Sequence, residues 1–67
     1  MNTLKLKFSR MQKGVTQRQM AKYLDISEKT YSIKETGKSE FDRNEISKII
    51  KALELSTEEL YTIFFED

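Results

Sequence analysis

The chain has 67 residues, a formal net charge of +1 and no cysteine, histidine or proline. Without cysteine or histidine it lacks disulfides, the usual metal ligands and the commonest general base, so we expect no metal, no cofactor and no enzymatic activity. The length predicts a single domain over residues 1–67, and no apolar run is long enough for a signal peptide or a membrane span, which is typical of a cytoplasmic protein.

The first predicted helix covers residues 3–13. Leu4, Phe8 and Met11 follow at i, i+4 and i+7, a stripe typical of the buried face of a helix. Leu6 lies off this stripe, where we expect it to pack against the last helix or against a partner subunit. The basic residues of this helix suit either a phosphate-facing helix start or ordinary solubility; they are Lys5, Lys7, Arg10 and Lys13.

The second predicted helix covers residues 17–24. Thr16 is placed to cap it, and Gln19 stands three residues later, the spacing of a capping box. Apolar and small residues then repeat on one face at helical spacing, namely Met20, Ala21 and Leu24. This helix is therefore predicted to pack its C-terminal half into the core.

The third predicted helix covers residues 28–36. Ser27 is placed to cap it, and Gly37 to end it in the left-handed conformation that glycine adopts most readily. Two short helices joined by a turn of about three residues form a helix-turn-helix unit.

The linker after Gly37 leads to a fourth predicted helix over residues 43–53. Phe41 is expected to plug the core, and Asp42 with Glu45 has the spacing of a capping box. The apolar residues of this helix recur at i, i+3, i+4 and i+7, which predicts a core stripe made of Ile46, Ile49, Ile50 and Leu53.

A last capping box, Ser56 with Glu59, opens a fifth predicted helix over residues 57–64. Leu60, Ile63 and Phe64 fall on one side of it. A domain this small cannot bury every aromatic residue near its C-terminus, so we expect an exposed apolar patch for dimerisation, with burial in the core as the alternative. The patch is predicted to consist of Tyr61, Phe64 and Phe65.

Charge is distributed unevenly along the chain. Residues 1–51 hold all twelve Lys and Arg against six acids, a balance of +6, whereas residues 52–67 hold five acids and no base. This asymmetry predicts a basic surface for an anionic partner and an acidic end turned away from it. Chance clustering on a solvated surface is the alternative.

Residues 16–37 resemble the helix-turn-helix unit of phage repressors and Cro proteins, the XRE-like transcriptional regulators. Counting from Gln17, that family has apolar residues at the fourth, eighth, tenth and fifteenth positions, which here are Met20, Leu24, Ile26 and Tyr31. The family has a small residue at the fifth position, here Ala21. The stretch KETGKSEF and the acidic C-terminus are similar to small regulators from phages and mobile elements of Gram-positive bacteria.

Arg10 and Glu35 match a pair that many members of the family use as a partly buried ion pair. Two positions depart from the family pattern: Asp25 replaces the usual Gly of the turn, and Lys34 replaces an apolar residue. Asp enters the left-handed region at modest cost, and Lys34 is expected to lay its stem on the core with its ammonium in water. The resemblance implies a compact all-α fold of five helices, of the lambda-repressor type.

In this fold the helix over residues 28–36 reads the major groove of DNA. Lys29 can donate to guanine, Glu28 can accept from cytosine N4, and Ile33 can contact a thymine methyl group. Ser32 completes the predicted set of base contacts. The alternative for Ile33 is an exposed apolar residue without a role.

Six further side chains are predicted to contact DNA phosphates. The family places a phosphate contact at the position of Gln17, helped by free N–H groups at the start of a helix. Lys38 follows the Gly37 stop, and Arg43 lies in the first turn of the fourth helix. The full set is Thr16, Gln17, Ser27, Thr36, Lys38 and Arg43.

The favoured function is a sequence-specific transcriptional regulator, similar to a Cro-type repressor, that binds a palindromic double-stranded operator as a homodimer in the bacterial nucleoid. The alternative from another class is a protein-interaction module, an anti-repressor or antitoxin-like partner that binds another regulator. Glu28 and the low net charge favour the alternative, whereas Gln17, Lys29 and Lys38 favour DNA. A helical bundle with neither role is the third possibility.

Overall fold

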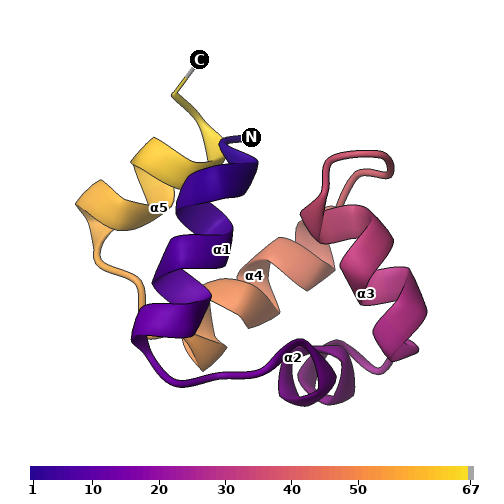
Figure 1. Ribbon diagram of the computed structural model, residues 1–67. Helices are drawn as coiled ribbons and strands as arrows, with labels where there is room; N and C mark the ends of the chain where they lie inside the picture. Colours follow the sequence, from indigo (N-terminus) through magenta and orange to yellow (C-terminus); the bar gives the residue numbers. More distant parts are fainter. Residues whose placement is uncertain (67) are drawn as a thin grey trace.

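The computed structural model describes residues 1–66, and within them the chain forms five helices and no strand (Figure 1). The predicted all-α fold is confirmed, and the predicted helix ends agree with the observed ones to within one residue. The helices are α1 (Thr3–Gln12), α2 (Gln17–Leu24), α3 (Glu28–Glu35), α4 (Arg43–Ala52) and α5 (Thr57–Phe64). No helix among residues 1–66 combines the length and apolar character needed to cross a membrane.

Side-chain caps explain where the helices begin. The three predicted capping boxes are present, at the starts of α2, α4 and α5, and in each the cap side chain and the third helical residue bond to one another's backbone N–H. Ser27 caps α3 as predicted, accepting from the N–H of Thr30 at 3.0 Å. The cap of α1, which the sequence analysis did not identify, is Asn2, whose Oδ1 accepts from the N–H of Lys5.

The turn inside the helix-turn-helix unit is made by a residue other than glycine. Asp25 has φ 58° and ψ 43°, the left-handed conformation, and its N–H bonds to the last carbonyls of α2. The substitution of Asp for the usual Gly therefore leaves the turn intact, as predicted. Gly37 ends the α3 segment with φ 90°, and a Cβ atom there would lie 3.1 Å from the Thr3 Cγ2 atom.

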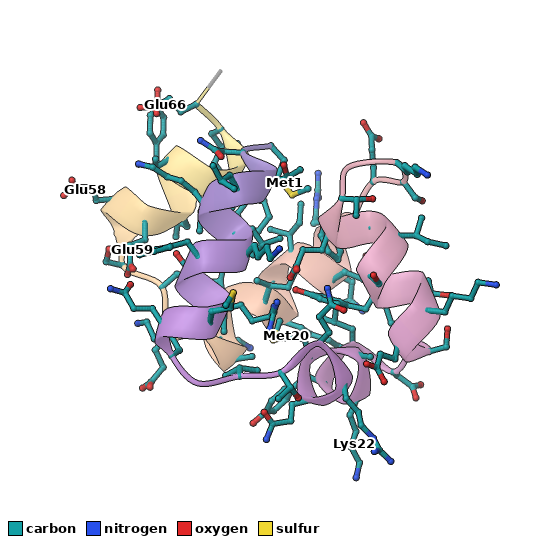
Figure 2. All side chains as sticks on the ribbon, viewed as in Figure 1. Met1, Met20, Lys22, Glu58, Glu59 and Glu66 are labelled. Atoms are coloured by element: carbon teal, nitrogen blue, oxygen red, sulfur yellow. The ribbon has the colours of Figure 1, made fainter. Side chains whose placement is uncertain are left out.

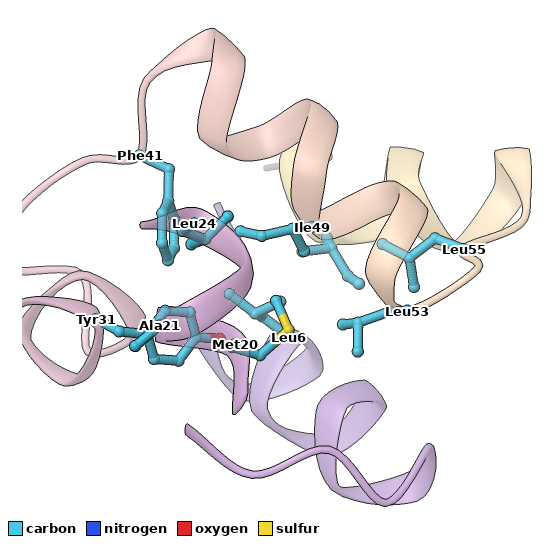
Figure 3. Packing of buried hydrophobic residues seen from close by; sticks show 10 residues of the cluster. Leu6, Met20, Ala21, Leu24, Tyr31, Phe41, Ile49, Leu53 and Leu55 are labelled. Carbon is cyan, nitrogen blue, oxygen red and sulfur yellow. The ribbon is translucent and has the colours of Figure 1, made fainter. Parts of the chain in front are cut away.

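The core lies where α2, α3 and α4 meet the inner face of α1 and the C-terminal half of α5, which buries Ile63. α2 packs against both α3 and α4, and α1 packs against α5 and α3. Figure 3 shows the core side chains converging from these elements. The largest fully buried side chains are Tyr31, Leu6, Met20, Ile49, Leu53 and Ile63, and Phe41 is buried beside Tyr31 as predicted.

One predicted buried face is wrong. Leu4, Phe8 and Met11 of α1 are exposed to solvent, whereas Leu6 is fully buried together with Ser9 and Arg10. Leu6 and Arg10 are four residues apart and share a helix face, so the helix that turns Arg10 inward turns Leu6 inward as well. The apolar stripe read from the sequence therefore faces outward.

Candidate nucleic-acid interface

A buried hydrogen-bond network joins the first three helices. The Arg10 Nε atom donates to Glu35 Oε2 at 2.8 Å, and its Nη2 atom donates to Glu35 Oε1 at 3.2 Å. The Tyr31 hydroxyl donates to Glu35 Oε2 at 2.6 Å, and the Gln17 Nε2 atom donates to Oε1 at 3.0 Å. Arg10 Nη1 also donates to the Val15 carbonyl at 2.7 Å. The predicted Arg10–Glu35 ion pair is therefore present, and it fixes α3 against α1 and α2.

The network controls the protonation of its members. Burial acts to raise the pKa of Glu35, but hydrogen bonds from Arg10, Tyr31 and Gln17 outweigh it and hold that pKa below its ordinary value. Burial, with the hydrogen bond and charge of Glu35, raises the pKa of Tyr31 far above its usual range. Glu35 is thus ionised and Tyr31 is a neutral donor at neutral pH. No side-chain polar atom buried within residues 1–66 lacks a hydrogen-bond partner.

The outward face of α3 carries the predicted base-reading residues. Tyr31 and Glu35 point into the core, so Lys29 and Ile33, four residues apart, lie on the opposite side of the helix. Glu28 and Lys29 are exposed, Ile33 is 39% exposed, and Ser32 is half-buried. In Figure 1, α3 stands at one edge of the molecule. The geometry can present a basic and an apolar side chain together to a groove.

The predicted phosphate contacts fall into two groups. Lys38 and Arg43 are exposed, after α3 and at the first position of α4, and neither forms an ion pair in the part of the chain that the structure describes. The remaining four already make protein contacts through their side chains: Thr16 and Ser27 cap helices, Gln17 bonds Glu35, and the Thr36 hydroxyl donates to the Ile33 carbonyl. At Thr16, Gln17 and Ser27 the anion-binding feature is the set of backbone N–H groups at the starts of α2 and α3, whereas Thr36 lies at the C-terminal end of α3.

Lys34 is placed differently from the prediction. Its Nζ atom donates to both carboxylate oxygens of Glu45, at 2.7 and 2.8 Å, and lies 6.0 Å from the centre of the Phe41 ring. The ammonium is therefore paired at the α3–α4 junction, not held in water. Glu45 is buried and also accepts from the N–H of Asp42, so its charge would be unpaired without Lys34. The sequence contained a signal for this pair: Lys34 stands where the family has an apolar residue, and Glu45 belongs to the capping box of the next helix.

The predicted dimer patch is only partly exposed. Tyr61 and Phe65 are exposed, whereas Phe64 is half-buried against the core. No group of three or more acidic, histidine or cysteine side chains within residues 1–66 is arranged to hold a metal ion.

Comparison with protein families gives a match over most of the chain. The family described as helix-turn-helix matches residues 6–60, which include all of α2, α3 and α4 and the Arg10–Glu35 pair. No curated protein and no solved structure matches the chain.

Proposed function

This chain belongs to the helix-turn-helix family of DNA-binding transcription regulators, and on that premise we propose that it is a Cro-like repressor. It reads a palindromic operator through the major groove with α3, as a homodimer. The observation that carries the proposal is the paired exposure of Lys29 and Ile33 on α3, whose other face is locked by the buried Glu35 network. A rigid helix with an outward basic and apolar pair suits base recognition.

Roles within the site follow from the chemistry of each side chain. Lys29 donates to a guanine, Ile33 contacts a thymine methyl group, and Glu28 accepts from a cytosine and disfavours wrong registers by repelling phosphate. Lys38 and Arg43 provide sequence-independent affinity by displacing counterions from the backbone. Thr16, Gln17 and Ser27 lie at the starts of α2 and α3, where backbone N–H groups approach phosphate oxygens, and Thr36 flanks the groove at the C-terminal end of α3.

The second candidate is a protein-interaction module, such as an anti-repressor or an antitoxin-like partner. It is favoured by the acidic Glu28 at the start of α3 and by the net charge of only +1. In that case the partner is another regulator, and the outward face of α3 or the exposed apolar side chains contact protein.

A salt titration of DNA binding separates the two candidates. For a DNA reader, the logarithm of the association constant falls linearly with the logarithm of salt concentration, by about 0.9 per neutralised phosphate. Lys38→Ala should weaken binding to all sequences alike and reduce that slope by about 1. Lys51→Ala, at the far end of α4, is the matched control and should leave the slope unchanged. Weak binding without salt dependence would contradict the DNA reader.

A further inference from the structure

The outer face of α1 is an apolar ridge without a partner in the described chain. Leu4, Phe8 and Met11 are 76%, 65% and 60% exposed, and all three lie on the side of the helix opposite the buried Leu6. Single exposed apolar residues are ordinary, but three large ones in a row on one helix mark an association surface. Neither the Glu35 network nor the α3 face uses this ridge.

A groove runs beside the ridge, between α1 and α5. Its volume is about 530 Å³, and Leu4, Phe8, Thr62 and Ile63 contribute to its walls and floor. The Asn2 N–H donates to the Ile63 carbonyl at 2.6 Å, so the two helices are tied together at one end of the groove. Two copies of such a surface can interlock, because the ridge of each can lie in the groove of the other.

The two sides of the groove carry opposite charges. Lys5 lines it from α1, and Glu58 and Glu59 line it from α5. Figure 2 shows both acids on α5, on the side of α1 that is away from α3. A surface that presents both signs is complementary to a copy of itself turned about a two-fold axis, because the basic side of each copy meets the acidic side of the other.

The area needed for a stable dimer also indicates that the α1 ridge takes part in self-association. A specific interface buries about 800 Å² on each partner, whereas an aromatic side chain supplies at most about 150–250 Å². Tyr61 and Phe65 alone, with Phe64 half-buried, fall short of that area. The exposed side chains of the α1 ridge add the apolar area that these aromatic residues lack.

We propose that the α1–α5 face is the surface through which two copies of this chain associate. The ridge of Leu4, Phe8 and Met11 of each copy lies in the α1–α5 groove of the other, and Lys5 of each copy faces Glu58 of the other. The inference rests on the homodimer of the proposed function and assigns that dimer its surface. The occupant of the groove is a second copy of the chain.

The first test is sedimentation of the free protein over a dilution series. Wild type should show a monomer–dimer equilibrium, and Phe8→Glu should raise the dissociation constant by about tenfold or more. Tyr23→Glu, which alters an equally exposed aromatic residue on α2, is the matched control and should behave as wild type. A wild type that remains monomeric, or a dimer that Phe8→Glu leaves intact, overturns the inference.

The second test exploits the opposite charges. Lys5→Glu and Glu58→Lys should each weaken self-association, and an equimolar mixture of the two variants should form a heterodimer in which every facing pair is again of opposite sign. Failure of the mixture to associate more strongly than either variant alone contradicts the pairing. Neither association test uses DNA, so the outcomes can be told apart by a separate DNA selection. A monomer that still selects a DNA sequence overturns this inference and the proposed homodimer but not the DNA reader, and a dimer that selects no sequence overturns the DNA reader only.

Discussion

A single buried carboxylate organises the contacts around α3. Glu35 accepts from Arg10 of α1, Gln17 of α2 and Tyr31 of its own helix, so one residue links α3 to both α1 and α2. Such a group is costly to bury and is tolerated because every oxygen is hydrogen-bonded. Removing one partner leaves an uncompensated charge among apolar side chains.

The Arg10–Glu35 pair predicts strong coupling between two substitutions. Arg10→Met or Glu35→Leu alone should lower the free energy of unfolding by about 3–5 kcal/mol, because each leaves its partner charged and unpaired. The double variant should lose much less than the sum of the two. Chemical denaturation of the four proteins, in a stabilising osmolyte if a single variant is unfolded, measures the coupling; a value near zero would show that the pair is not a unit.

The pKa of Glu35 predicts a loss of stability in acid. Because that pKa is held below the ordinary 4.5 in the folded chain, the unfolded state binds more protons in acid and stability falls as pH drops. The contribution is fully present above the ordinary carboxyl pKa and is lost as pH falls through the folded pKa. In Glu35→Gln this contribution is absent. The stability difference between wild type and this variant should therefore narrow in acid, and a difference that does not change with pH would refute the assignment.

At the scale of elements, the ends of the helices could be predicted from the sequence and the rotation of α1 could not be predicted from its apolar pattern. The signals that begin and end a helix lie within a few residues of its ends, so helix boundaries can be read directly from Thr16, Ser27 and Gly37. Which face of α1 is buried depends on a contact with α3. The Arg10–Glu35 pair, taken with the i, i+4 spacing of Leu6 and Arg10, contained the correct answer.

For the candidate site, the sequence predicted which side chains are exposed on α3 better than it predicted their hydrogen-bond partners. Glu28, Lys29 and Ile33 are exposed on α3 as expected, since the buried Tyr31 fixes the opposite face. The engagement of Gln17 with Glu35 and of Lys34 with Glu45 was not foreseen, because both are pairings between helices that periodicity within one helix cannot reveal. The left-handed conformation of Glu54, with φ 50°, was also missed, because glutamate is not a residue type that signals a turn.

The turn between α2 and α3 gives a prediction at the scale of an element. Asp25→Gly should be close to neutral, because glycine adopts the left-handed conformation without strain but loses more entropy on folding. Asp25→Ala should be about 1–2 kcal/mol less stable than Asp25→Gly, because alanine keeps the Cβ that crowds the carbonyl oxygen and lacks the short polar side chain by which aspartate tolerates this conformation. Thermal melts of the two variants check the order, and an alanine variant as stable as the glycine variant would show that the turn rearranges.

At the scale of the whole molecule, the chain presents two distinct surfaces. α3 lies on one side, and α5 with its acidic residues lies on the other, with α1 between them (Figure 1). The longest dimension over the Cα atoms is 28 Å, shorter than the roughly 34 Å between major-groove segments one turn apart. One copy therefore cannot read both halves of a palindrome, and a dimer built away from α3 leaves both reading helices available for DNA.

The most direct measurement for this account is selection of sequences from random double-stranded DNA by wild type and by Lys29→Ala. Wild type should enrich a palindrome whose half-sites lie about one helical turn apart. Lys29→Ala should lose about 1–3 kcal/mol of discrimination at one base position in each half-site and keep the preference elsewhere. Enrichment of no sequence by wild type, or an identical preference in the variant, would contradict the assignment of α3 as the reading helix.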